Sequence, residues 1–221
     1  MGEKEGNLAL KNKTYVLNRI LFVVCTCLLF TGCYFAATEY AQARAVQAVA
    51  EKVLRFHVIA KSDSANDQRR KLLVRDAVGD WMQLKLSEVE NLEACEEVIL
   101  KNEKQICRIA EEALEKDGKK EHVLVRLADV EFPEKTYGAY RFPAGTYRAL
   151  QVVIGEGNGH NWWCVLYPNL CFSAEGYDET GDEAEKELTK VLSASEYEML
   201  LKENSYKLDV KYLKWLKFWE D

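Results

Sequence analysis

The feature that most constrains this chain is an uncharged, apolar segment at residues 20–37, ILFVVCTCLLFTGCYFAA. At about 1.5 Å rise per residue, a helix of this length just crosses the roughly 30 Å hydrocarbon layer of a bilayer. The polar stretch before it carries Lys4, Lys11, Lys13 and Arg19, and a basic flank tends to stay in the cytoplasm. The segment therefore predicts export of everything that follows it.

Two sequence motifs leave the fate of this segment open. Ala41-Gln42-Ala43 has the A-x-A form of a signal-peptidase site, and cleavage there would release a chain that starts near Arg44. Leu29-Phe30-Thr31-Gly32-Cys33 loosely matches a bacterial lipobox, in which Cys33 would be lipidated. Without cleavage the chain stays anchored. We expect four regions: a basic cytoplasmic N-terminus at 1–19, a signal peptide or membrane anchor at 20–37, a helical stalk at 38–52, and an exported domain at 53–221.

The exported part has the composition of a folded acidic domain. The whole chain is 48% hydrophobic with only three prolines, which predicts a packed core. Residues 44–221 hold 26 basic and 33 acidic side chains, a formal net charge of −7. Such a balance argues against nucleic acid as the principal partner, because nucleic-acid affinity comes largely from Lys and Arg contacts to phosphates.

The cysteines also separate into two groups. Cys25, Cys27 and Cys33 lie in the apolar segment, whereas Cys95, Cys107, Cys164 and Cys171 follow it, where disulfides can persist. Cys95 and Cys107 fall twelve residues apart on one predicted helix, a separation of about 18 Å that no disulfide spans. Closeness in sequence favours a bridge between Cys164 and Cys171.

The periodicity of the exported part predicts an α+β fold. Residues 53–60 form a strand by alternation, and we expect its central His57 to be a hydrogen-bonded strand residue. Two helices follow, started by Ser64 with Asp67 and by Ser87 with Glu90 in the spacing of capping boxes. Strands are expected at 122–132 and 146–155, a short strand or helix start at 163–167, an acidic helix at 177–193 and a short helix started by Ser195. This order predicts a single small mixed or antiparallel sheet covered by helices, preceded by the N-terminal transmembrane or signal helix.

The stretch at residues 155–172, GEGNGHNWWCVLYPNLCF, contains the residues most suggestive of chemistry. Cys164 with His160 could form an activated nucleophile, with Glu156 orienting the histidine. The three histidines of the chain offer no HExxH motif, and no CxxC occurs, so no metal is expected. Gly155, Gly157 and Gly159 are spaced G-x-G-x-G, which does not match the dinucleotide fingerprint and favours a tight turn without a cofactor.

Two aromatic features favour binding over catalysis. Trp162 and Trp163 are adjacent, and neighbours on a strand point to opposite faces. One can therefore be buried while the other is an exposed binding anchor, although a small domain can also bury both under loops. The basic, aromatic C-terminal residues 206–221 fit either a helix packed on the sheet or one that lies on a membrane or partner.

Two longer blocks carry a family resemblance, LRFHVIAKSDSANDQRRKLLVRDAV and YGAYRFPAGTYRALQVVIGEGNGHNWWCVLYPNLCF. Over residues 53–172 the chain resembles the stage II sporulation protein R family of endospore-forming bacteria. The resemblance implies a secreted signalling protein, made in the forespore and exported into the space between the two membranes. There it would activate a membrane-embedded aspartic protease that cleaves the precursor of a mother-cell sigma factor. The family offers no catalytic residues to transfer, only the matching motifs at 57–64, 74–77 and 155–172.

These observations predict a non-enzymatic, exported activator of that protease, bound to the membrane through residues 20–37 if uncleaved. The residues expected to bind the partner lie in the matching motifs: Asp63, Arg75, Asp76, Glu156, His160, Asn161, Trp162 and Trp163. Two alternatives remain, an exported hydrolase that uses Cys164 and His160, and a membrane-tethered structural protein. No cofactor, metal or nucleic acid is expected in any of the three cases.

Overall fold

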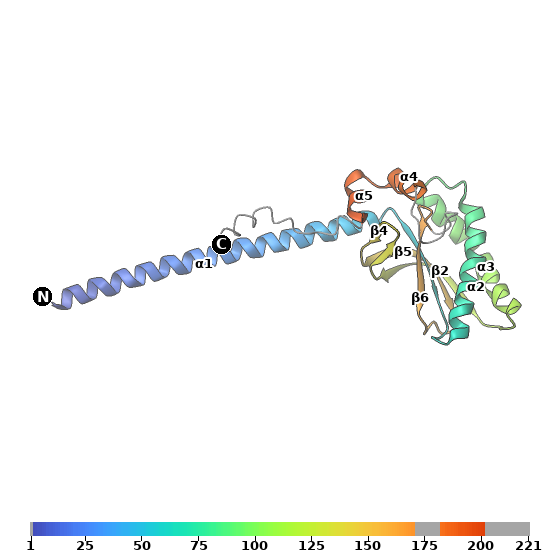
Figure 1. Cartoon of the computed structure of the whole chain (residues 1–221), viewed down its shortest axis with the longest axis horizontal. Coiled ribbons are helices and arrows are strands. Elements are labelled where there is room, and N and C mark those ends of the chain that lie inside the picture. Colours follow the sequence, from blue (N-terminus) through green and yellow to red (C-terminus); the bar gives the residue numbers. More distant parts are fainter. Residues whose placement is uncertain (1, 171–181, 202–221) are drawn as a thin grey trace, which may run out of the picture. The chain divides into compact units, whose positions relative to one another are not determined.

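A computed structural model describes residues 2–170 and 182–201, and side chains are described from Tyr15 onwards and outside residues 182–183. The first helix, α1 (Gly2–Ala50), contains one stretch, Tyr15–Ala50, that is long and apolar enough to cross a membrane. A signal sequence near the N-terminus would meet the same criterion. Residues 38–50 of the predicted stalk continue this helix, which ends at Ala50. The chain divides into two compact units, Met1–Ala45 and Val46–Asp221 (Figure 1).

The second unit is built on a four-stranded sheet with the order β2-β5-β1-β6. The strands are β1 (Leu54–Ile59), β2 (Val123–Phe132), β5 (Gly145–Ile154) and β6 (Asn161–Tyr167). β1 pairs in parallel with β5, while β6 and β2 pair antiparallel at the two edges. The sheet is therefore mixed, and residues 161–167 form a strand rather than the start of a helix.

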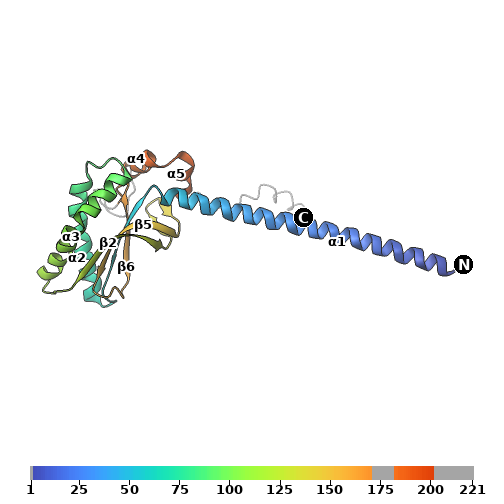
Figure 2. The same ribbon diagram turned by 180° about the vertical axis from the view of Figure 1, so that it is seen from behind.

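Two long helices, α2 (Ala65–Leu86) and α3 (Leu92–Lys116), cover one face of this sheet (Figures 1 and 2). Ser64 caps α2 as predicted, because its side chain accepts a hydrogen bond from the Asp67 backbone N–H. The predicted second start at Ser87 is wrong: Ser87 ends α2, and the Asn91 side chain caps α3 by accepting from the Ala94 N–H at 2.8 Å. A helix-side core fills the interface, made of fully buried residues such as Phe56, Val58, Leu150, Val74, Val78, Ile99 and Ile106.

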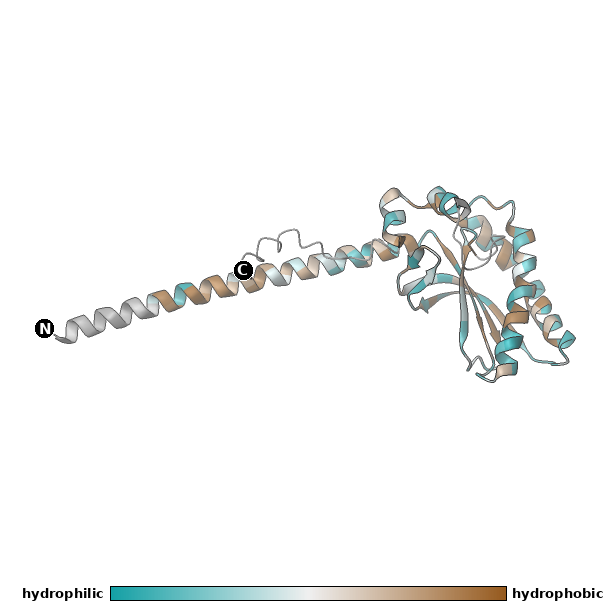
Figure 3. Ribbon diagram, viewed as in Figure 1, coloured by the Kyte–Doolittle hydropathy of each residue, from teal (hydrophilic) through white to brown (hydrophobic). Residues whose placement is uncertain are grey.

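A second core lies on the far side of the sheet. It joins the end of α1 to a short hairpin, β3 (Lys135–Tyr137) and β4 (Tyr140–Phe142), and to α4 (Asp182–Val191) and α5 (Ala194–Leu200). The hairpin forms a second, two-stranded sheet in a stretch for which no strand was predicted. α5 starts at Ser193 with Glu196 in a capping box, two residues before the predicted Ser195. Figure 3 shows apolar residues along much of α1 after its first turns and in the layers of the domain.

Candidate functional site

The glycine-rich loop after β5 lies directly against the loop between β1 and α2. The Gly159 N–H donates to the Ala60 carbonyl at 2.9 Å, and the Asn158 N–H donates to the Lys61 carbonyl at 3.1 Å. Gly155 and Gly157 have φ values of +57° and +65°, which glycine adopts far more readily than other residues. The interpretation of GEGNG as a tight turn is confirmed, and its backbone amides bind the neighbouring loop.

This contact brings together Asp63 and His160, which are far apart in the sequence. The Asp63 carboxylate accepts from the His160 backbone N–H at 2.7 Å and lies 2.5 Å from the ring Nδ1. These two interactions, the ring contact first, hold the pKa of Asp63 below its ordinary value. Both side chains stay exposed, at 82% for His160 and 54% for Asp63, so the ring is fixed in orientation yet open to a partner.

A side chain of helix α2 holds the backbone of His160 in place. The buried Lys71 ammonium donates to the His160 carbonyl at 3.1 Å and to the Gln68 side chain at 2.6 Å. Burial lowers the pKa of Lys71 from its ordinary value. One turn further along α2, the Arg75 guanidinium lies over the Trp162 ring at 5.3 Å. We call the group of Asp63, Lys71, Arg75, His160 and Trp162 the Asp63–His160 patch.

Of the remaining residues predicted to bind a partner, Asp76 borders this patch, whereas Glu156, Asn161 and Trp163 lie elsewhere. Asp76 pairs with Arg75 at 2.5 Å and therefore borders the patch. Glu156 is 3.8 Å from the Lys61 ammonium, in a separate ionic cluster. Asn161, opposite Ile59 in the β1–β6 register, lies with Trp163 on the other face of the sheet.

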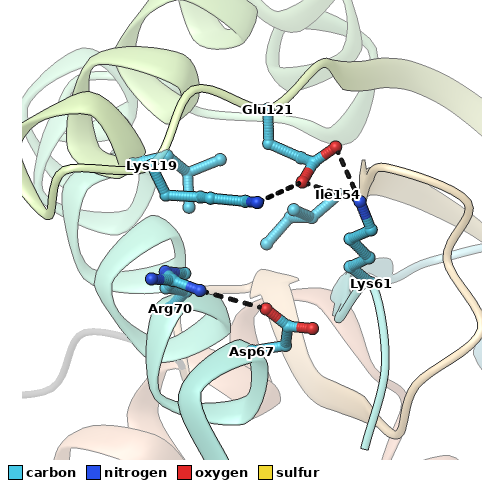
Figure 4. A pocket seen from close by; sticks show the side chains of 7 residues that line it. Lys61, Asp67, Arg70, Lys119, Glu121 and Ile154 are labelled. Atoms are coloured by element: carbon cyan, nitrogen blue, oxygen red, sulfur yellow. Dashed lines mark hydrogen bonds and ion pairs between the residues drawn. The ribbon is translucent and has the colours of Figure 1, made fainter. Parts of the chain in front are cut away.

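The ionic cluster next to Glu156 lines a small pocket (Figure 4). In that view Lys61 and Lys119 point to the Glu121 carboxylate, and Arg70 points to Asp67. The Lys61–Glu121 distance is 2.9 Å, and Arg70 also reaches Asp117 at 3.0 Å. Each of these cations already has a carboxylate partner. The ion pairs of the pocket therefore connect neighbouring loops and leave little free positive charge for an anionic ligand.

The two tryptophans do point to opposite faces, as predicted. Trp162 packs edge-on against Phe56 in the helix-side core, whereas Trp163 stacks on His57 on the far side at a centroid distance of 4.9 Å. Neither of the two arrangements left open by the sequence, one buried ring with one exposed ring or two buried rings, is found, because both rings are half-buried. Each tryptophan is therefore part core and part surface.

The structure weakens the case for a cysteine nucleophile. Cys164 is fully buried in β6, whereas an activated thiolate must meet its substrate. Its predicted disulfide partner, Cys171, lies outside the described residues, as do residues 206–221, so both expectations stay predictions. Cys95 and Cys107 are free thiols on α3, consistent with the prediction that they do not bridge each other, and burial raises the pKa of Cys95 to about 12.

Sequence reasoning missed two groups of this region. Lys71 gave no signal, because nothing in a helical pattern marks a buried lysine. His57 is buried in β1 as expected, but the expected hydrogen bonds are wrong: neither ring nitrogen has a partner in the part of the chain that the structure describes. Within the same described residues, no group of three or more His, Cys, Asp and Glu side chains could hold a metal ion.

Comparison of the sequence with known proteins identifies a family. Residues 50–177, more than half of the chain, match the family described as stage II sporulation protein R. The chain belongs to the stage II sporulation protein R family. It is 35% identical over 150 residues to the stage II sporulation protein R of Bacillus subtilis (strain 168), covering 65% of this chain and 67% of that relative. No solved structure matches it. Every residue of the Asp63–His160 patch lies within the family match, residues 50–177.

Proposed function

We propose that this chain is an exported, non-enzymatic activator of a membrane-embedded sporulation aspartic protease. It would bind the extracytoplasmic part of that protease in the forespore intermembrane space, and so trigger processing of a sigma factor precursor. The family membership supports the sporulation role, and the apolar part of α1 supports export or anchoring.

The observation that carries this proposal is the Asp63–His160 patch. The exposed His160 ring contacts the Asp63 carboxylate, while the His160 backbone N–H donates to the same carboxylate and its carbonyl accepts from the buried Lys71. An interface that is ordered before binding loses less conformational entropy when the partner arrives. Trp162 and Arg75 add the residue types that most often dominate binding energy. We therefore place the protease contact here.

The test compares alanine substitutions at Asp63 and His160 with matched substitutions elsewhere. Asp129 and His122 are the controls, because their side chains are 68% and 81% exposed on β2 and next to its start. We expect Asp63→Ala and His160→Ala to weaken binding of the full chain to the protease's extracytoplasmic segment at least tenfold. Precursor processing in cells should fall in parallel, because each substitution removes the contact between the Asp63 carboxylate and the His160 ring.

Circular dichroism would confirm that each variant is folded, and binding would be measured by surface plasmon resonance. Unchanged binding in both patch variants would move the interface elsewhere. Failure of the unmodified chain to bind the protease segment would overturn the proposed function itself. Hydrolysis of a substrate by the chain, lost in His160→Ala, would instead favour the enzyme alternative.

A further inference from the structure

The far side of the main sheet is only partly covered. The far-side core packs on one end of the strands, where Val165, Ala149 and Phe132 are buried. Toward the glycine-rich loop, Figures 1 and 2 show no described helix over this face. Leu124 is 46% exposed there, and Trp163 is half-buried. We call this part the open sheet face and define it by Ile59, Leu124, Arg126, Gln151, Val153 and Trp163.

The charge on this face differs from that of the domain as a whole. Strand alternation sends Arg55, His57 and Arg126 to the far side of the sheet, together with apolar and amide side chains and no carboxylate. The Lys135 ammonium adds a cation 5.9 Å from the Trp163 ring centre. The exported part carries a net charge of −7, so a face that presents only cations is a marked local exception.

In the part of the chain that the structure describes, neither Arg126 nor Lys135 forms an ion pair with a carboxylate. The Arg126 Nε donates to the Gln151 amide oxygen, a neutral acceptor, at 2.5 Å. Of the carboxylates nearest along the chain, Glu134 pairs with Arg141 and Glu156 with Lys61. Beneath the surface, both ring nitrogens of His57 are buried without a hydrogen-bond partner among the described residues. Positive charge and polar atoms without a hydrogen-bond partner among the described residues therefore lie next to the Trp163 ring.

We propose that the open sheet face binds an acidic segment of a partner protein that also carries aromatic or aliphatic side chains. The carboxylates of that segment pair with Arg126 and Lys135, and its apolar side chains pack on Trp163 and Leu124. Arg and Trp are the residue types that most often anchor protein interfaces. This surface lies on the opposite side of β6 from the Asp63–His160 patch, and the inference stands whichever protein that patch binds.

Other occupants fit the same face less well. A membrane attracts a protein with about 1 kcal/mol per exposed basic residue, and two such residues do not offset a net charge of −7. A second copy that used the same face would set Arg126 and Lys135 against their own counterparts, which like-charge repulsion disfavours.

The probe is a fluorescein-labelled octapeptide of alternating Glu and Tyr, titrated against the full chain in zwitterionic micelles and followed by fluorescence anisotropy. The matched peptide has Gln in place of Glu. We expect saturable binding of the acidic peptide, and binding at least tenfold weaker for the Gln peptide. The double variant Arg126→Glu/Lys135→Glu should lower the affinity at least tenfold, and Arg126→Gln/Lys135→Gln should fall between it and the native chain.

The control is Lys120→Glu, a single reversal of a lysine charge at a side chain that is 91% exposed in the loop between α3 and β2. It should bind the peptide within twofold of the native chain at about 0.1 M salt, where interactions between exposed charges are strongly screened. Equal affinity for the two peptides, or an equal loss in Lys120→Glu, would overturn the proposal.

Two further results would assign the face to another occupant and also overturn it. One is displacement of the labelled peptide by dihexanoyl-phosphatidylglycerol, used below its critical micelle concentration. The lipid would have to displace the labelled peptide at a lower concentration than the unlabelled peptide does. The other is a dimer of the native chain, seen by analytical ultracentrifugation, that dissociates in the charge-reversed variant.

Discussion

Arg55 is a fully buried cation that rests on aromatic rings. Its Nε donates to the Cys164 carbonyl at 3.0 Å, and one terminal nitrogen donates to the Tyr137 hydroxyl at 2.9 Å. The guanidinium carbon also lies 4.5 Å from the centre of the Phe132 ring and 4.9 Å from that of Tyr147. A planar, delocalised cation suits such faces, whereas the compact ammonium of lysine would lose both hydrogen-bond geometry and stacking. Even so, burial lowers the pKa of Arg55.

His57, two residues along β1, shares this environment and stays neutral. Burial, followed by the nearby charges of Arg126 and Arg55, lowers the pKa of His57 from 6.5 to about 4. Between these two values the unfolded chain binds more protons at this residue than the folded chain does. Stability is therefore full above about pH 6.5 and falls as the pH drops toward 4, by a contribution on the order of 3 kcal/mol.

Replacing His57 with phenylalanine should remove this pH dependence. The ring would still stack on Trp163, and no nitrogen would remain to protonate. In urea unfolding of the full chain, followed by tryptophan fluorescence, the native protein should lose more unfolding free energy between pH 6.5 and 4 than His57→Phe does. The same substitution at the exposed His122 controls for the loss of a histidine. Parallel curves for the native chain and His57→Phe would show that His57 takes no part.

At the scale of elements, the contact between the glycine-rich loop and the β1–α2 loop sets the position of His160. A Cβ added at Gly159 would lie 2.4 Å from the Ser62 carbonyl oxygen, which is backbone and cannot turn aside. Gly159→Ala should therefore push the loops apart and destabilise the protein by about 1–3 kcal/mol. The control is Gly145→Ala, whose added Cβ would meet only the side chains of Val46 and Tyr147, at 3.2 and 3.7 Å. Urea midpoints measure both effects, and a midpoint for Gly159→Ala at or above that of Gly145→Ala would refute this account.

The elements were predictable where a local pattern determines them. Alternation indicated β1 and β2, the β-forming residues indicated β5, and the Ser64 cap indicated the start of α2. The predicted start of α3 was wrong because Ser87 and Asn91 both have a side chain that can cap a helix, and only packing selects between them. The β3–β4 hairpin was not predicted because its three-residue strands are too short to show an alternating pattern in the sequence.

The site followed the same division between local and long-range information. Alternation alone placed Trp162 and Trp163 on opposite faces. In contrast, the contact of Asp63 with His160 spans 97 residues and depends on the parallel pairing of β1 with β5, which no local pattern specifies. The buried Lys71 is a further consequence of that pairing, because its acceptor is a carbonyl on the distant loop.

At the scale of the whole molecule, the boundary between the two compact units falls between residues 45 and 46. The expected peptidase motif at residues 41–43 lies just before it, so a chain released near Arg44 would keep the complete second unit. The residues that follow the boundary matter for stability. Val49 and Val53 are fully buried in the far-side core, and Lys52 pairs with Glu196 of α5 at 2.6 Å.

Two truncations would locate the start of the folding unit. A chain that begins at Val46 keeps every one of these contacts, so it should unfold cooperatively in urea without detergent. A chain that begins at Leu54 loses two buried valines, each worth about 1.5 kcal/mol or more, out of a typical total of about 5–15 kcal/mol. Its urea midpoint should therefore fall clearly below that of the longer chain. Equal midpoints would mean that residues 46–53 only connect the units, and an unfolded Val46 chain would mean that the exported domain needs more of α1 than its core contacts indicate.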